Sequence, residues 1–197
     1  ADAICAAAGK SCYSERPASE LVHDESPEKV LDRIVGMGHH SVIEHASFTF
    51  SVEGVSRSLT HQLVRHRIAS FSQQSQRYVS LDEPTYVMPE TISGDPEARK
   101  LFEEAMERVW EVYRELGERF PAEDARYVLP NACTTNITIT MNARELLHFF
   151  SLRCCNRAQW EIREMADRML ALSREVSPTI FRDGGPPCIR GPCPEGK

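Results

Sequence analysis

The chain has 197 residues, of which 41% are hydrophobic and 26% are charged, so it is not a disordered chain and can bury a sizeable core. It carries 23 basic and 29 acidic residues, and the net charge of −6 argues against a general nucleic-acid-binding protein. No apolar run approaches the roughly 18 residues that a membrane-spanning helix needs.

The first half of the chain predicts three helices and a strand. An Ala-rich stretch at 2–12 predicts a helix, and a second helix begins at Ser26-Pro27-Glu28 and stops at Gly36. Apolar and polar residues alternate over 48–52, which predicts a half-buried strand. Helical spacing returns over 55–64.

The second half predicts further elements of both kinds. Short strands are predicted at 77–81 and 86–88, followed by a long helix from Asp95-Pro96 to about Gly117. Alternation over 137–141 predicts a strand. A capping box then opens a helix at Asn142, running through Phe150, and a last helix spans Trp160 to Pro178.

These elements are mixed without a regular strand–helix–strand alternation, which predicts an α+β fold: a mixed sheet flanked by helices in a single domain. We expect this domain to cover residues 1–183, with a tail rich in Pro, Gly and Cys at 184–197.

The seven cysteines indicate a reducing compartment, because an odd number in a chain of this size is typical of a cytoplasmic protein. Cys188 and Cys193 are separated by four residues, whereas zinc sites usually need about four ligands in tighter pairs. We therefore expect structural thiols and no bound metal.

Acidic residues are absent from three stretches that contain arginines. These are Gly54–Leu81, Ala125–Arg144 and Ser151–Trp160. The planar guanidinium group of arginine presents N–H donors in a fixed geometry that suits phosphates and planar amide edges. The stretches are therefore candidate anion sites. Ordinary surface arginines with chance spacing are the alternative.

The densest of these clusters is Arg65-His66-Arg67, which a Ser- and Gln-rich segment at 70–77 follows. On a helix Arg65 and Arg67 would be about 200° apart, so the helix ends there or the two bind different ligands. The segment after them is predicted to be a loop that wraps a polar molecule, or else a plain polar surface loop. No glycine-rich phosphate-binding motif occurs.

Several sequence blocks resemble one family. Arg65-His66-Arg67 is followed, after seven residues, by Ser75, and this run resembles the signature of the flavin-dependent thymidylate synthases. Further blocks that resemble the family lie in the same order, at 38–45, 125–130, 142–146, and at Arg153 with 158–163. The resemblance extends from about Ala6 to Pro194.

The resemblance implies a methyltransferase that converts dUMP to dTMP. The carbon comes from methylenetetrahydrofolate and the reducing equivalents come from NADPH through FAD. It also implies a homotetramer whose active sites are shared between subunits. No cysteine nucleophile is expected; instead Arg153 is implied as the catalytic residue that activates the uracil ring electrostatically.

The resemblance also implies two sets of binding residues. The dUMP-binding set is Gln62, Leu63, Val64, Arg65, Gln73, Gln74, Ser75, Gln76, Arg77, Arg126 and Arg153. The FAD-binding set is Ser41, Glu44, Arg65, His66, Arg67, Gln73, Asn142, Ala143, Arg144 and His148. Gln73 departs from the pattern, since many members carry Glu there.

A second interpretation is a non-catalytic module that binds nucleotides or RNA through the same arginines. The net charge of −6 and the scarcity of aromatic residues among the arginines argue against RNA. The family blocks favour the enzyme.

Overall fold

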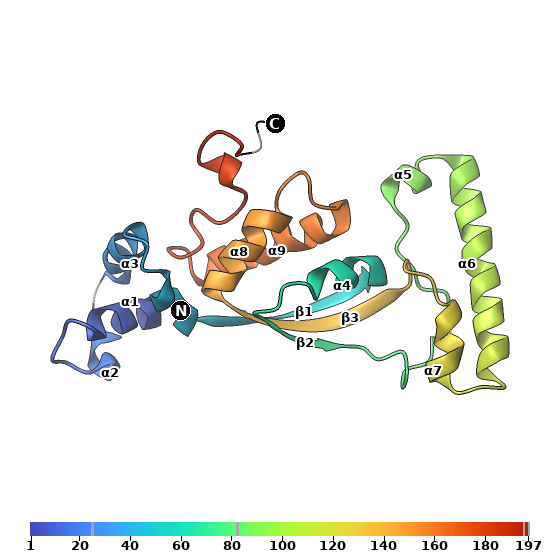
Figure 1. Ribbon diagram of the computed structural model, residues 1–197, viewed down its shortest axis with the longest axis horizontal. Helices are drawn as coiled ribbons and strands as arrows, with labels where there is room; N and C mark the ends of the chain where they lie inside the picture. Colours follow the sequence, from blue (N-terminus) through green and yellow to red (C-terminus); the bar gives the residue numbers. More distant parts are fainter. Residues whose placement is uncertain (25, 82, 195, 197) are drawn as a thin grey trace. The chain divides into compact units, whose positions relative to one another are not determined.

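The computed structural model describes residues 1–24, 26–81, 83–194 and 196 (Figure 1). Its α-helices are α1 (Asp2–Ser11), α2 (Ala18–Leu21), α3 (Pro27–Gly36), α4 (Arg57–Leu63), α5 (Glu90–Ser93), α6 (Pro96–Gly117), α7 (Ala122–Ala125), α8 (Ala143–Arg153) and α9 (Trp160–Val176). Its 3-10 helices are η1 (His40–His45), η2 (Arg126–Val128) and η3 (Pro187–Ile189). Its strands are β1 (Ser47–Ser56), β2 (Ser70–Gln73) and β3 (Thr134–Asn142).

The strands form one sheet in the order β1-β3-β2. The backbone N–H of Ala143 donates to the Ala46 carbonyl, and the N–H of Arg57 donates to the Cys133 carbonyl. Ascending residues of β1 therefore pair with descending residues of β3, so these two strands are antiparallel. With its helices, the sheet confirms the predicted α+β class.

The described chain divides into two compact units. Unit 1 comprises Ala1–Phe50, His66–Ser70 and Ile139–Lys197, and unit 2 comprises Ser51–Arg65 and Phe71–Thr138. The predicted boundary at residue 183 stays a prediction.

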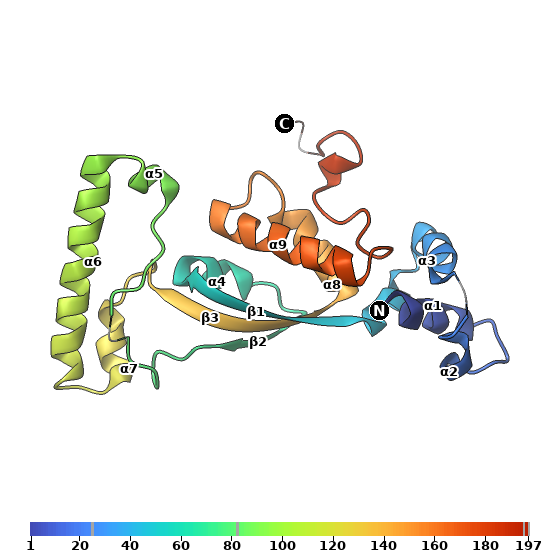
Figure 2. The same ribbon diagram turned by 180° about the vertical axis from the view of Figure 1, so that it is seen from behind.

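Unit 1 contains two helical groups. Helix α1 packs against α2, α3 and η1, while α8 packs against α9 and η1. Helices α8 and α9 lie side by side in both ribbon views (Figures 1 and 2). Aromatic rings form the centre of this unit: Phe150 meets Phe149 and Phe181 edge to face, with ring centroids 5.7 and 5.9 Å apart.

Unit 2 is built around the long helix α6, which packs against α5, α7 and η2. Its buried face carries Met106, Trp110 and Tyr113, which pack with Ala125 and Cys133. The 3.6-residue period places these three helical side chains on one side of α6, facing the core.

Polar side chains fix where four helices begin. Asp95 accepts from the Glu97 and Ala98 amides at the start of α6. The Ser56, Asn142 and Gln159 side chains likewise accept from the third backbone amide beyond them, at α4, α8 and α9. Each cap satisfies an amide that has no partner within the helix, worth about 1 kcal/mol.

The predictions for the segment between α4 and α6 are wrong. Residues 77–81 form no strand; the chain turns there, with the Tyr78 and Val79 amides donating to the Ser75 carbonyl. Residues 86–88 contribute only an isolated bridge, between Tyr86 and Cys133. The strand lies earlier, at Ser70–Gln73, where a loop was expected.

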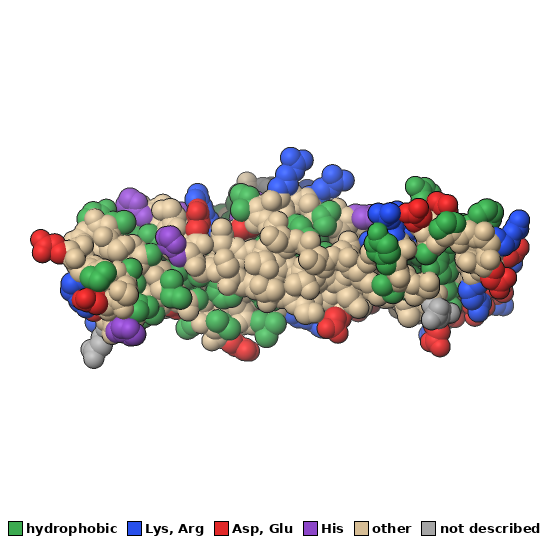
Figure 3. Space-filling view, turned by 90° about the horizontal axis from the view of Figure 1, so that it is seen from below, with side chains coloured by type: hydrophobic (Ala, Val, Ile, Leu, Met, Phe, Trp, Pro, Cys, Tyr) green, Lys and Arg blue, Asp and Glu red, His purple; other side chains and the backbone are tan. Residues whose placement is uncertain are grey.

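One face of the sheet is polar and uncharged along much of its length. In β3, Asn136 and Thr138 are exposed, whereas Ile137 and Ile139 are buried. Alternate positions of β1 over 47–51 are exposed Ser or Thr. The surface seen in Figure 3 carries a broad band of neutral polar side chains and backbone.

Among the described helices, none combines the length and the apolar character needed to cross a membrane.

The contact between α1 and α3 depends on the absence of a side chain at Gly9. A Cβ there would lie 2.4 Å from Ile34 Cδ1, whereas one at Gly36 would meet no described atom within 4 Å. We expect Gly9→Val to lower the free energy of unfolding by about 1–3 kcal/mol through overpacking. Gly36→Val is the matched control, and urea unfolding measures both. Equal losses in the two variants would show that this contact is not tightly packed.

Candidate functional site

The predicted site residues lie in both units, and each group is described by itself. Unit 1 holds Ser41, Glu44, His66, Arg67, Asn142, Ala143, Arg144, His148 and Arg153. Unit 2 holds Gln62, Leu63, Val64, Arg65, Gln73, Gln74, Ser75, Gln76, Arg77 and Arg126.

In unit 1 the site is arranged along α8. The Asn142 side chain accepts from the Glu145 amide and fixes the start of this helix where β3 ends. Glu145, Phe149 and Arg153 then follow at four-residue intervals, so they line one side of the helix.

Two polar contacts connect α8 to His66. Arg153 Nε donates to His66 Nε2 at 3.0 Å. On the other side of the ring, His66 Nδ1 lies 3.6 Å from Glu145 Oε1. The His66 and Glu145 side chains are only 6% and 9% exposed, so the histidine sits between a cation and a carboxyl group inside unit 1.

The electrostatics of this cluster keep His66 neutral. Burial lowers the pKa of His66 to about 4, and the neighbouring Arg153 and His148 lower it further. Because Nε2 accepts from Arg153, the single ring proton of the neutral form is on Nδ1, which faces Glu145. Burial also raises the pKa of Glu145.

The ring of His66 is held by aromatic packing as well. Its centroid lies 4.9 Å from that of Phe149, with the two planes at 76°. The His148 ring lies farther away, at 6.3 Å, and its side chain is exposed. His148 is therefore placed near the buried cluster but faces outward from it.

An ion pair between two predicted site residues of unit 1 lies at the surface. Arg144 Nη1 donates to Glu44 Oε1 at 2.5 Å, and both side chains are substantially exposed. Glu44 lies in η1, which packs on α8, together with the exposed Ser41. The structure thus brings the predicted residues Ser41, Glu44 and Arg144 onto neighbouring elements, while Ala143 is buried.

In unit 2 the end of β2 and the segment after it are held by their own side chains. Gln73 Nε2 donates to Thr60 Oγ1 at 3.0 Å and lies 3.4 Å from Thr135 Oγ1. Gln76 Nε2 donates to Cys133 Sγ at 3.1 Å. The predicted wrapping loop therefore begins as a strand, and two of its amide side chains bind the protein.

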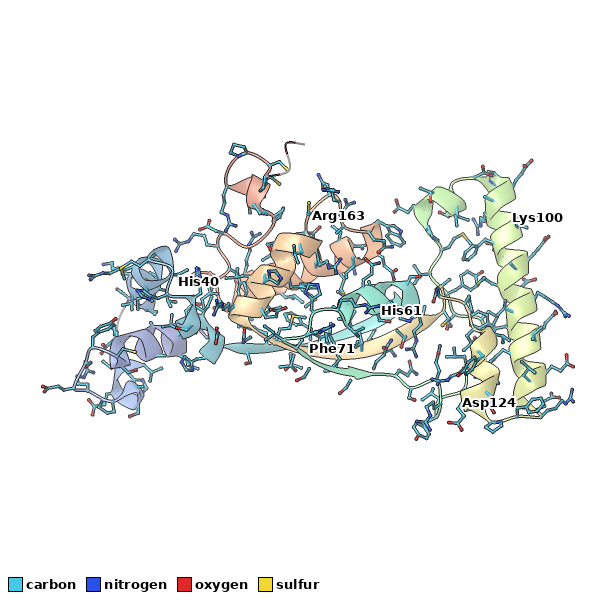
Figure 4. The ribbon with its side chains drawn as sticks, viewed as in Figure 1. His40, His61, Phe71, Lys100, Asp124 and Arg163 are labelled. Atoms are coloured by element: carbon cyan, nitrogen blue, oxygen red, sulfur yellow. The ribbon has the colours of Figure 1, made fainter. Side chains whose placement is uncertain are left out.

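Four residues of the predicted nucleotide set, 62–65, lie at the end of α4 and directly after it. Leu63 is buried in the core, whereas Val64 and Arg65 are exposed just beyond the helix. His61 lies on α4 and Phe71 on β2, as labelled in Figure 4. Since the helix ends at Leu63, Arg65 and Arg67 are not constrained to opposite sides of one helix.

Arg77 and Arg126 both contact Glu123. Arg77 Nη2 lies 2.9 Å from Glu123 Oε2, and Arg126 Nε donates to the Glu123 backbone carbonyl at 3.1 Å. These contacts bring two arginines from distant parts of the sequence to the same stretch of α7.

Sequence reasoning missed two polar residues that organise these groups. In the sequence, Glu145 belongs only to the capping box at Asn142 and to the family block at 142–146, and neither indicates its place beside His66. Arg57 is only one of the arginines in the acid-free stretch Gly54–Leu81. Its Nη2 donates to the Gln74 carbonyl at 3.1 Å, and its buried Nε has no hydrogen-bond partner among the described residues.

No three His, Cys, Asp or Glu side chains gather into a possible metal site within residues 1–24, 26–81, 83–194 and 196. All seven cysteines are free thiols.

Comparison with known proteins gives consistent results. Residues 1–179 match the family described as thymidylate synthase complementing protein. A flavin-dependent thymidylate synthase of Geobacter sulfurreducens is 55% identical, over 99% of this chain and 87% of its own length. One of Pyrococcus furiosus is 50% identical, over 89% of this chain and 76% of its own length.

A solved structure is similar as well. The UMP/dUMP methylase PolB of Streptomyces cacaoi, crystallised with 5-Br dUMP, superposes with a TM-score of 0.78. It shares 26% sequence identity and covers 92% of this chain and 88% of its own.

The buried neutral His66 predicts a pH dependence of stability. Between pH 6.5 and 4 the unfolded chain binds a proton at this residue that the folded chain rejects, so stability falls as the pH falls through this range. The difference between the pKa of His66 in the unfolded and in the folded chain corresponds to about 3 kcal/mol of stability. Above pH 6.5 the contribution of His66 no longer changes.

Urea unfolding between pH 4.5 and 7 tests this expectation. The raised pKa of Glu145 gives a slope of opposite sign, so the comparison with a His66→Gln variant isolates the histidine. We expect a smaller loss of stability on acidification in the variant. Parallel curves for the two proteins would contradict the assignment of a neutral His66.

Proposed function

The chain belongs to the thymidylate synthase complementing protein family, and on this premise we propose that it is a FAD-dependent thymidylate synthase. It transfers the methylene group of methylenetetrahydrofolate to dUMP, and NADPH supplies the hydride that completes the methyl group of dTMP. Tetrahydrofolate and NADP+ are the other products. The observation that carries this proposal is a half-buried arginine, Arg153, held by a neutral histidine.

The uracil ring has to be activated because its C5 is a poor nucleophile. A guanidinium beside the N3–C2–O2 edge would stabilise the negative charge that develops on the ring. Arg153 suits this role, since its guanidinium stays protonated and one of its five N–H groups is already directed to His66. We assign it as the catalytic residue.

The donors of the chain fit FAD. Arg67 in unit 1 and Arg65 in unit 2 are exposed and form no ion pair with any residue that the structure describes. Such guanidinium groups suit a diphosphate, as does the exposed hydroxyl of Ser41. Asn142, Ala143, Arg144, Glu44, His66, Gln73 and His148 complete the proposed set. When bound, FAD supplies the transfer of reducing equivalents.

For dUMP we assign Arg77, Arg126 and Ser75 to the phosphate. Arg77 would exchange its contact with the Glu123 carboxylate for the stronger charge of a phosphate, and Arg126, which donates to the Glu123 carbonyl, would offer its remaining N–H groups. Gln62, Leu63, Val64, Arg65, Gln73, Gln74 and Gln76 remain proposed as further nucleotide contacts. The Nε2 groups of Gln73 and Gln76 already donate to the protein, so we assign these donors to holding the shape of the segment and the side-chain oxygens to the ligand.

We further propose that the chain acts as a homotetramer with shared active sites. The visible spectrum of the purified protein tests the central claim. A flavin spectrum that NADPH bleaches, faster when dUMP is present, supports the enzyme. If no flavin binds even after incubation with FAD, a nucleotide-binding module is the better interpretation.

Replacing Arg153 tests the catalytic assignment. We expect Arg153→Ala to retain the flavin absorbance and to lower dTMP formation by at least about 10²-fold, the usual effect of removing a group that stabilises developing charge. Arg168→Ala is the matched control, because Arg168 is exposed on α9 and pairs with Glu164 one turn earlier on the same helix. Normal turnover in Arg153→Ala would remove the residue from its proposed role.

The cysteines provide an independent test. Burial, together with the neighbouring Asp167, raises the pKa of the Cys154 thiol to about 12, so it is protonated at neutral pH and a poor nucleophile. We expect Cys154→Ser and the exposed-site variant Cys188→Ser to make dTMP at rates close to that of the unsubstituted chain. An inactive single variant with unchanged flavin content would point to cysteine chemistry instead.

A further inference from the structure

We propose that His66 and Glu145 are positioning residues that orient the guanidinium of Arg153 toward its substrate. This inference rests on the proposed function of Arg153. It also gives His66 a role through another side chain, in place of direct binding of FAD by its ring nitrogens.

The direction of the hydrogen bond between Arg153 and His66 fixes the protonation state of the ring. A guanidinium has N–H donors and no acceptor, so the 3.0 Å contact requires a lone pair on His66 Nε2. A protonated histidine would have none and would place a second positive charge against Arg153. Only the neutral ring with its proton on Nδ1 can hold the arginine.

Glu145 selects that tautomer of His66. Glu145 Oε1 faces Nδ1 at 3.6 Å, close enough to favour the proton on this nitrogen by charge, although too long for a good hydrogen bond. Among the described residues, Glu145 provides the carboxyl group that faces His66. Glu145 therefore acts on Arg153 through the ring.

The surroundings of His66 and Glu145 also hold both side chains rigidly. His66 and Glu145 are nearly completely buried, and the His66 ring is fixed by the edge of Phe149. Glu145 and Arg153 lie two turns apart on α8, so the two residues that contact His66 are held by the same helix. Because Nε is bound to a fixed ring, the plane of the guanidinium is set before any ligand arrives.

Loss of this orientation is expected to affect the chemical step more than binding, because a catalytic group displaced by about 1 Å can cost about 10²-fold in rate. Three variants separate the contributions. His66→Phe keeps an aromatic ring and removes the acceptor. His66→Gln restores an acceptor for Arg153 and a donor for Glu145. Glu145→Gln removes the charge and keeps an acceptor for Nδ1–H.

Steady-state kinetics of dTMP formation is the first measurement. We expect His66→Phe to lower kcat by about 10²-fold with little change in the KM for dUMP, and His66→Gln to recover a large part of the loss. The kcat of Glu145→Gln is expected to lie between those of His66→Phe and His66→Gln. His23→Phe is the matched control, because His23 is exposed and lies in the short turn after α2.

The double variant His66→Phe/Arg153→Ala shows whether the two residues act as a unit. If His66 works through Arg153, the double variant is no slower than Arg153→Ala alone. Losses that multiply in the double variant, or a kcat of His66→Phe within about twofold of the unsubstituted chain, would overturn the proposal.

A spectroscopic measurement separates this inference from the proposed function. The Nε–H of Arg153, assigned by its absence in Arg153→Lys, is expected as a slowly exchanging proton resonance in the unsubstituted protein and in His66→Gln. It is expected to exchange rapidly in His66→Phe. No dTMP from the unsubstituted chain would overturn the proposed function, whereas an unprotected Nε–H would overturn the positioning role itself.

Discussion

The junction between β3 and α8 is the constraint on which the arrangement of unit 1 depends. Asn142 ends the strand and its side chain caps the helix, while the Ala143 amide is bonded to Ala46 beside β1. With the start of α8 fixed, the helical repeat decides where Glu145, Phe149 and Arg153 lie. The capped first turn of α8 therefore sets the positions of the buried Glu145, the aromatic ring of Phe149 and the half-buried Arg153.

This geometry has an electrostatic consequence for His66. A buried site beside a guanidinium disfavours a second cation, which explains why the pKa of His66 lies at about 4 and its ring is neutral. The neutral ring is in turn the only form that can accept from Arg153. Burial, protonation state and orientation thus support one another, and a change in any of them disturbs the other two.

The sequence predicted most of the elements because each carried a local signal. The Asp95 cap, the apolar stripe of α6 and the capping residue Asn142 act over a few residues, and all three are found as expected. The strand Ser70–Gln73 was missed because its polar residues resemble a loop. Its Ser-Phe-Ser-Gln alternation, with Phe71 and Gln73 half-buried, was the available signal.

The sequence predicts which residues belong to the candidate site, but it does not predict which of them contact one another. Family blocks supplied His66, Gln73 and Arg153 as residues, yet the bond between His66 and Arg153 joins positions far apart in the chain. Gln73 shows the physical reason. The Thr60 hydroxyl donates to the Arg57 carbonyl, so its oxygen has to accept from position 73, which an amide satisfies and an ionised carboxylate does not. The glutamine at this position is therefore explained by a neighbour in space, which a pattern read along the chain does not contain.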